Sequence, residues 1–289
     1  MSAMEEWLEC AASPDYWRAL CPELTIGGAQ AAPALEVDDP LRTRLLGAML
    51  EDGYFVLPSV VDPAPMAAMA AAVEHLSDAS IPTSFLFVYD QPWQTSAWAG
   101  SILATILGAD FRVVPGVWAW RVAGGERGWE PHREHGFERI LPSGMPASLS
   151  LWIPITDATP ANGCIYCLPA HADPLYTQHN DDVEVTEPQA VRALPAPAGS
   201  ILGWNHALIH WGGCADLEPP GPRVSINLEY QRGDVAPFER PLLDPWSLPP
   251  FEHRLGLLGL QFEHYAGHFD PPPELLAMAA ALRERFPID

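Results

Sequence analysis

The feature that most constrains the fold is a series of short β-rich segments between about residues 84 and 233, each bounded by Gly, Pro, Asn or Asp. In chain order the segments are SFLFVY, FRVVPGVWAWRV, ASLSLWIPI, CIYCLPA, SILGW, ALIHW and RVSINLEYQ. Many short strands with frequent turn signals are typical of an antiparallel sandwich or barrel. The sequence therefore predicts a β core in this part of the chain.

Helical patterns precede the β-rich region. Apolar residues at helical spacing predict a helix over residues 41–52, and YFVL after Gly53 predicts a short strand. The pair Asp62-Pro63 is a helix-start signal, and it opens an Ala/Met-rich helix to about residue 79.

The two ends of the chain carry weaker patterns. Residues 1–40 lack clean periodicity and predict an irregular N-terminal extension with one short helix at most. The Pro-rich stretch 237–250 predicts a surface loop, and ELLAMAAALRERF, residues 274–286, predicts a closing helix. Helices before and after a β core predict a single α+β domain, built on a barrel or sandwich, over residues 1–289.

Composition and charge narrow the possible partners. Of 289 residues, 48% are hydrophobic and 18% are charged, so the chain can bury a sizeable core. The formal net charge of −22 repels phosphate backbones and anionic membranes. No apolar run approaches the roughly 20 residues of a membrane span, so we expect neither a nucleic acid nor a membrane as partner. An acidic start without an export signal and only five cysteines predict a cytoplasmic protein, whose oligomeric state the sequence leaves unknown.

The triplet His132-Arg133-Glu134 is the first candidate for chemistry. Residues i and i+2 of an extended segment point to the same face, so His132 and Glu134 can hold one ion together. His210 follows 78 residues later (210 − 132), at the end of the run ALIH. Two imidazoles and one carboxylate, with positions left open, are the ligand set of non-haem Fe(II) oxygenases. Taken alone, an H-x-E triplet also suits a solvated turn.

A second pair of residues adds a reason to expect a small-molecule site. Arg223 lies 13 residues after His210 (223 − 210), at the start of the strand RVSINLEY, and Ser225 shares its face. An inward-facing Arg in a barrel is costly unless it meets an anion. A guanidinium fork beside a hydroxyl suits a carboxylate. A structural ion pair within the protein is the alternative for Arg223.

Several nearby residues compete for these roles. His135 points to the opposite face of an extended segment from Glu134, and His206 is expected to be hydrogen-bonded in the connection before the strand of His210. Arg121 could meet a substrate or cosubstrate carboxylate, or form an ion pair. Residues i and i+3 of a strand face opposite ways, so the C-x-x-C motif that begins at Cys164 predicts ordinary core cysteines.

In combination, the motifs resemble the phytanoyl-CoA dioxygenase (PhyH-like) family of Fe(II)/2-oxoglutarate-dependent oxygenases. The segments LLGAMLEDGYFVLPSVVDP, LWIPITDATPANGCIYCLPAH and PAPAGSILGWNHALIHWGG are similar to further family segments, and the resemblance covers about residues 41–232. It implies a double-stranded β-helix, or jelly roll, flanked by N- and C-terminal helices, with a C-terminal loop and helices in residues 233–289. It also implies site residues by position: His132, Glu134 and His210 as catalytic iron ligands, Arg223 and Ser225 as the 2-oxoglutarate anchor, and Trp152 as an aromatic on the cosubstrate side. An ordinary core Trp is the alternative for the last of these.

The activity implied by the resemblance uses Fe(II), 2-oxoglutarate and O2. Such an enzyme hydroxylates, or otherwise oxidises at a C–H bond, a small-molecule substrate, here expected to be a specialised metabolite, and releases succinate and CO2. The family usually has Asp where this chain has Glu134, and a carboxylate there tells against a halogenase. Aromatic-rich residues 85–98 and 118–129 are candidates for substrate contacts. A His/Glu/His zinc-dependent hydrolase and a non-catalytic jelly-roll binding protein are the alternatives.

Overall fold

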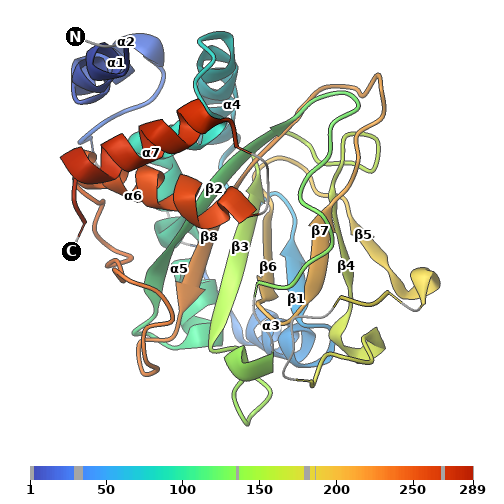
Figure 1. Cartoon of the computed structure of the whole chain (residues 1–289). Coiled ribbons are helices and arrows are strands. Elements are labelled where there is room, and N and C mark those ends of the chain that lie inside the picture. Colours follow the sequence, from blue (N-terminus) through green and yellow to red (C-terminus); the bar gives the residue numbers. More distant parts are fainter. Residues whose placement is uncertain are drawn as a thin grey trace.

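Two antiparallel β-sheets lie at the centre of the molecule, and helices cover the larger one (Figure 1). The computed structural model describes residues 3–28, 35–134, 137–178, 183–185, 187–267 and 271–288. Within these ranges, one sheet has five strands in the order β1-β6-β3-β8-β2, and the other has three in the order β5-β4-β7. Strands distant in sequence pair as neighbours, as the double-stranded β-helix requires. The predicted α+β jelly-roll class is confirmed.

Most of the predicted strands form. The strands are β1 (Tyr54–Leu57), β2 (Arg112–Val122), β3 (Ser148–Pro154), β4 (Ile165–Leu168), β5 (Arg192–Leu194), β6 (Ile201–Asn205), β7 (Ile209–Gly212) and β8 (Arg223–Gln231). The α-helices are α1 (Ala3–Ala11), α2 (Pro14–Leu20), α3 (Asp39–Glu51), α4 (Pro63–Asp78), α5 (Thr95–Leu107), α6 (Phe251–His264) and α7 (Pro273–Arg285). Each predicted β-rich segment except SFLFVY contains a strand, while the short edge strand β5 was not predicted.

Strand β8 determines what lies on each face of the larger sheet. It pairs with β3 on one side and β2 on the other, and every residue in it is buried. Its alternate apolar residues pack in the main hydrophobic core: Val224, Ile226, Leu228 and Tyr230. The residues between them are polar: Arg223, Ser225, Asn227, Glu229 and Gln231. Since successive side chains of a strand point to opposite faces, the polar row faces the inside of the jelly roll.

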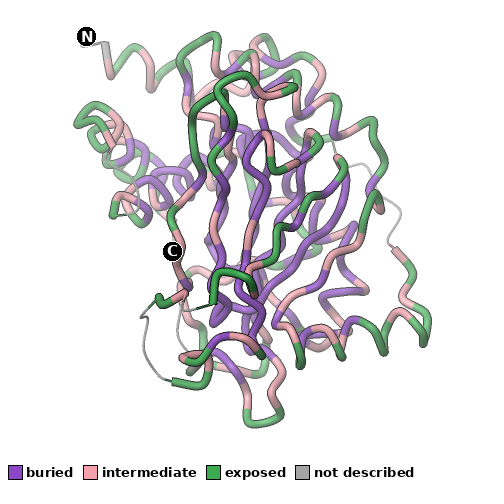
Figure 2. Tube along the Cα trace, turned by 90° about the vertical axis from the view of Figure 1, so that its right-hand side faces the viewer, coloured by how far each residue is buried: buried purple, intermediate pink, exposed green. Residues whose placement is uncertain are grey.

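Helices close the apolar face of this sheet. Helix α6 contacts β2 and α7, while α3 contacts β1 and α5. The strands at the centre are buried along most of their length, whereas the connecting turns at the periphery are exposed (Figure 2). No helix in the described ranges has the length and apolar character that crossing a membrane requires.

The helices and the Pro-rich loop that were predicted around the β core are present in the structure. Helix α4 begins after Asp62, whose side chain accepts a hydrogen bond of 2.8 Å from the backbone N–H of Ala64. Helices α3 and α7 cover all but the last residue of the predicted segments 41–52 and 274–286. The Pro-rich stretch 237–250 contains neither helix nor strand, and Leu243 within it pairs with Val113 of β2.

The expectation of an irregular N-terminal extension over residues 1–40 is wrong for much of its length. Residues 3–11 and 14–20 form α1 and α2. Trp17 of α2 is fully buried and stacks on Phe85, with ring centroids 5.3 Å apart. Trp7 of α1 also packs against Phe85, with ring centroids 5.6 Å apart. Contacts with residues distant in sequence therefore attach this segment to the body.

The segment SFLFVY is not a strand. It lies in a 3₁₀ helix, Thr83–Val88, whose residues 84–88 are all buried. A short apolar run buried on every side has no period that separates strand from helix. Helix α5 was missed because it too is buried on most sides. Helix α6 contains Gly256 and Gly259, which lower helix propensity but allow close contact with the C-terminal segment that contains α7.

Candidate functional site

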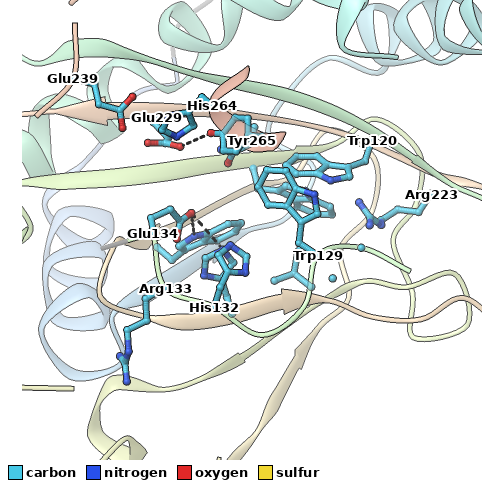
Figure 3. A pocket seen from close by; sticks show the side chains of 17 residues that line it. Trp120, Trp129, His132, Arg133, Glu134, Arg223, Glu229, Glu239, His264 and Tyr265 are labelled. Atoms are coloured by element: carbon cyan, nitrogen blue, oxygen red, sulfur yellow. Dashed lines mark hydrogen bonds and ion pairs between the residues drawn. The ribbon is translucent and has the colours of Figure 1, made fainter. Parts of the chain in front are cut away.

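The predicted metal-binding triad comes together inside the jelly roll (Figure 3). The backbones of His132 and His210 pair, and each N–H donates to the other's carbonyl, at 3.1 and 3.0 Å. Their imidazoles lie on one side of this pair, with ring centroids 4.4 Å apart. Glu134 places its Oε1 3.4 Å from Nε2 of His210. One potential ligand atom from each residue lies within 4.8 Å of the others, which is close enough for one metal ion.

Backbone carbonyls orient both imidazoles. Nδ1 of His132 lies 2.7 Å from the carbonyl oxygen of Glu130, and Nδ1 of His210 lies 3.1 Å from that of Leu208. A carbonyl oxygen only accepts hydrogen bonds, so each Nδ1 must carry the proton and donate it. The lone pair for a metal is then on Nε2 of each ring. This arrangement, in which the second nitrogen fixes the tautomer, is usual for metal-binding histidines.

Hydrogen bonds hold the carboxylate of Glu134 through only one of its two oxygens. Its Oε1 accepts hydrogen bonds from Ser150 Oγ at 3.0 Å and from Trp204 Nε1 at 3.4 Å. Its Oε2 is buried and has no hydrogen-bond partner among the described residues. Burial raises the pKa of this carboxyl, but attraction to His210 and more weakly to His132 outweighs burial and holds the pKa well below its ordinary value. The group is therefore an ionised carboxylate with one unpaired oxygen.

Arg133, between two members of the triad, fixes the segment that carries them. Figure 3 shows its side chain directed away from Glu134 and His132. Its guanidinium forms a buried ion pair with Asp173, N to O 2.7 Å, and donates to the carbonyl of Ala207. Because both charged side chains are almost wholly buried, the pair anchors the H-x-E segment firmly.

Arg223 lies in the same pocket as the triad but has no acidic partner among the described residues. Its side chain is 1% exposed, and NH1 donates to Ser225 Oγ at 2.6 Å. The Nε atom is buried and unpaired in the described part of the chain. Burial lowers the pKa of this guanidinium to about 10, so Arg223 remains a cation at neutral pH. A buried cation of this kind is costly unless an anion binds beside it.

Two glycines allow the backbone to pass close to Arg223. A Cβ on Gly128 would lie 2.6 Å from Cα of Gly212 and 3.2 Å from NH2 of Arg223, and a Cβ on Gly212 would be equally crowded. Trp152 lies on the same side, with its ring centroid 5.6 Å from Cζ of Arg223. The pocket thus brings together three buried polar atoms that lack partners within the described residues: Glu134 Oε2, Arg223 Nε and Asn227 Oδ1. Their chemistry fits a metal cation and a carboxylate-bearing small molecule.

The other end of the pocket is acidic and aromatic. Glu229 of β8 is buried there, and Oε1 accepts a hydrogen bond of 3.0 Å from the hydroxyl of Tyr265. Tyr265 follows α6 and packs against Trp129 with ring centroids 4.8 Å apart. Glu239, from the Pro-rich stretch, and His264 also line this end.

The other residues that the sequence singled out can now be compared with their positions in the structure. Trp152 and Ser225 lie as just described, beside Arg223. Arg121 is outside the pocket lining and forms two hydrogen bonds of 2.9 Å with Glu74, so its ion-pair alternative is the correct one. His206 lies in the turn before β7 and hydrogen-bonds Ser148 Oγ through Nδ1, at 2.9 Å, as expected. His135 lies outside the described residues.

The prediction for the cysteines is confirmed, whereas only one of the two aromatic-rich segments lines the pocket. Cys164 and Cys167 are buried free thiols in a hydrophobic cluster, as predicted. From segment 118–129, Trp120 and Trp129 line the pocket. Segment 85–98 instead contributes its aromatic side chains to the main hydrophobic core, so it is not a wall of the site.

Sequence reasoning missed Asn227, Glu229 and Tyr265. For the first two a signal existed, because they continue the i, i+2 row that begins at Arg223 and Ser225. For Tyr265 none existed, since a C-terminal segment brings it to the pocket through tertiary packing alone.

A second group of metal-competent side chains lies elsewhere. Cys21, Glu23 and His75 have ligand atoms within 4.8 Å of one another. Nδ1 of His75 lies 3.2 Å from Oε1 of Glu23, an ordinary ion-pair distance, and the pocket lining contains none of the three. The triad in the pocket is therefore the stronger candidate site.

Comparisons with known proteins agree with this geometry. The model of the phytanoyl-CoA dioxygenase (PhyH) family matches residues 121–214, about a third of the chain, and this range includes all three triad residues. The resemblance predicted from the sequence is thereby confirmed. No curated protein sequence matches the chain.

Solved structures show the same fold at low sequence identity. EctD from S. alaskensis, crystallised with 2-oxoglutarate and 5-hydroxyectoine, is 18% identical, with a TM-score of 0.52 over 77% of this chain and 91% of its own. SnoK, described as a non-heme alpha-ketoglutarate-dependent carbocyclase from nogalamycin biosynthesis, is 17% identical, with a TM-score of 0.51 over 75% and 100%. HygX from Streptomyces hygroscopicus, crystallised with nickel and 2-oxoglutarate, is 13% identical, with a TM-score of 0.51 over 68% and 89%.

Proposed function

We propose that this protein is an Fe(II)- and 2-oxoglutarate-dependent dioxygenase that oxidises a C–H bond of a small-molecule substrate, releasing succinate and CO2. The observation that carries the proposal is Arg223: a buried cation without an acidic partner in the described residues, in the pocket of a two-histidine, one-carboxylate triad. A metal site alone fits many activities. A metal site together with an unpaired guanidinium fits a metal-chelating carboxylate cosubstrate.

In this proposal one group of residues binds the metal and another binds the cosubstrate. Nε2 of His132, Nε2 of His210 and the carboxylate of Glu134 hold Fe(II) and leave positions open. Arg223 and Ser225 bind the distal carboxylate of 2-oxoglutarate, while Trp152 flanks it. Bound iron supplies the activation of dioxygen. The chain contributes position, charge and exclusion of water.

Glu134 is compatible with this role although the family resemblance leads one to expect Asp. Its extra methylene must be accommodated if the carboxylate is to reach the metal. The hydrogen bonds from Ser150 and Trp204 hold Oε1 on the histidine side, 3.4 Å from Nε2 of His210. A carboxylate at this position favours hydroxylation-type chemistry over halogenation.

The alternatives account for fewer of the observations. A zinc-dependent hydrolase would use the triad but has no need of a buried cation beside Ser225. A non-catalytic binding protein would have no reason to keep three competent donors, each oriented by its own hydrogen bonds.

The test is an anaerobic titration of the metal-free protein with Fe(II) and then 2-oxoglutarate. We expect a visible metal-to-ligand charge-transfer band that is absent with Fe(II) alone. Glu134→Ala should lose the iron, and Arg223→Gln should keep the iron but weaken 2-oxoglutarate binding. Arg121→Gln, which removes a cation outside the pocket, is the matched control. Absence of the band in the wild-type protein, with metal content unchanged in Glu134→Ala, would show that the proposal is wrong.

A further inference from the structure

The inner row of β8 has a basic residue at one end and an acidic residue towards the other. Arg223 and Glu229 are six residues apart (229 − 223), so their Cα atoms are separated by about 20 Å along the strand. Both side chains are buried and both line the pocket. Figure 3 shows Glu229 and Glu239 above Glu134, and Arg223 well to the right of all three. The pocket thus has a basic end and a separate acidic end.

An irregularity in strand β2 accommodates the side chain of Glu229. Strand β2 shifts register against β8 between Val114 and Val117, so that two extra residues lie between the partners of Glu229 and Leu228. One of them is Gly116, where a Cβ would lie 2.5 Å from Oε1 of Glu229. The bulge therefore makes room for this carboxylate, and the Tyr265 hydroxyl aims it through a hydrogen bond of 3.0 Å. His206 contributes a longer contact, Nε2 to Oε2 3.8 Å, from behind.

The surroundings of Glu229 favour a cation. Glu239 lines the same end, and Trp129 and Tyr265, whose rings pack on each other, also line the pocket. Aromatic faces and carboxylates together are what ammonium groups bind in proteins. Arg139 lies near both glutamates, with Cζ 3.6 Å from the ring centroid of Phe238, but it is not in the pocket lining. The other lining cation, Arg133, is directed away and paired with Asp173.

The net charge of the protein also favours a cationic ligand. The net charge of −22 raises the local concentration of cations and repels anions. An anionic cosubstrate therefore depends on Arg223 for binding, whereas a cationic substrate is attracted by the protein as a whole.

We propose that the substrate of this site carries a protonated amine, and that Glu229, aimed by Tyr265, binds it. This inference rests on the proposed function, because it places the amine in the same pocket as the iron, at the end away from the 2-oxoglutarate anchor. The amine would fix which C–H bond faces the metal.

The experiment uses the anaerobic Fe(II)–2-oxoglutarate complex of the full chain. Polyamines, amino sugars and basic amino acids are added one at a time, each beside its N-acetylated counterpart. The readouts are a shift of the charge-transfer band and, in air, stimulated succinate release. We expect responses from the amines but not from their acetylated forms. Glu229→Gln should weaken the responding amine about 10- to 100-fold, the range for a lost charge-assisted hydrogen bond.

Controls separate this inference from the proposed function. Glu138→Gln removes an exposed carboxylate next in sequence to Arg139 and should leave amine binding unchanged. Tyr265→Phe should weaken amine binding less than Glu229→Gln does, without altering the charge-transfer band. If the band forms but no amine shifts it, if acetylated forms act equally, or if Glu229→Gln binds amines normally, the inference is wrong while the proposed function stands. If no band forms at all, the proposed function fails.

Discussion

Replacing Arg223 with Met is expected to stabilise the protein without ligand and to abolish its response to 2-oxoglutarate. Burial lowers the pKa of this guanidinium to about 10, which corresponds to roughly 3 kcal/mol of cost for the charged form. The polar contacts of Arg223 with described residues offset only part of this cost. They are one hydrogen bond to Ser225, worth about 1 kcal/mol, and the ring of Trp152, whose centroid lies 5.6 Å from Cζ. The net gain on substitution is therefore about 1–2 kcal/mol.

The assay is thermal unfolding of the Fe(II) protein under nitrogen, with and without 2-oxoglutarate. A gain of about 1–2 kcal/mol should raise the Tm by roughly 2–6 °C in a chain of this size. The wild-type protein should be stabilised further by 2-oxoglutarate, by about 2.7 kcal/mol at one hundred times its Kd. Arg223→Met should lose that increment.

Arg254 provides a matched control. It is equally buried, at 2% exposed, but it pairs with Asp90 at 2.8 Å and donates to two backbone carbonyls. Arg254→Met leaves the buried carboxylate of Asp90 without its cation and should destabilise the protein by about 3–5 kcal/mol. If Arg223→Met is as damaging as Arg254→Met, Arg223 has a structural partner and the reasoning fails. A 2-oxoglutarate shift that survives in Arg223→Met would refute it equally.

Three further predictions concern the surroundings of the triad. Glu134→Ala should lose bound iron, measured by metal analysis, while the far-ultraviolet circular dichroism stays unchanged; retained iron would contradict the ligand assignment. Asp173→Asn breaks the buried ion pair with Arg133 and should destabilise the fold by about 3–5 kcal/mol in denaturant titrations, and an effect below 1 kcal/mol would argue against the anchoring role. Burial first, and then repulsion by Glu134, raises the pKa of Glu229 well above its ordinary value of 4.5. Without a bound metal or amine, the folded chain then retains a proton that the unfolded chain releases, so the stability of the empty protein should fall as the pH rises above about 4.5. Glu229→Gln should flatten this fall, and parallel pH profiles would contradict the assignment.

The sequence predicted the parts of this molecule whose patterns are local. Strand β8 reads as a strict alternation, and its observed bounds match the predicted segment RVSINLEYQ. Helix α4 was recognisable from the capping signal at Asp62. The H-x-E spacing placed His132 and Glu134 on one face, and the structure brings them together with His210.

What the sequence could not give depends on contacts between distant segments. Trp17 attaches α2 by stacking on a residue 68 positions away (85 − 17). The glycines of α6 disfavour a helix locally, yet close packing with the C-terminal segment requires them. Tyr265 reaches the pocket because α6 packs along β2, and a pattern in its own segment cannot report that.

The polar row on β8 explains why the site and the stability of the fold are linked. A strand buried on both faces is ordinarily apolar on both, but here the inner face carries Arg223, Asn227 and Glu229. Unpaired polar atoms in a protein interior each cost about 1–3 kcal/mol, and this pocket collects three of them in the described structure. Metal would satisfy Glu134 Oε2 and the cosubstrate carboxylate would satisfy Arg223, which recovers part of that free energy. We therefore expect the loaded protein to be markedly more stable than the empty one, with Arg223 and Glu134 as the residues through which each ligand acts.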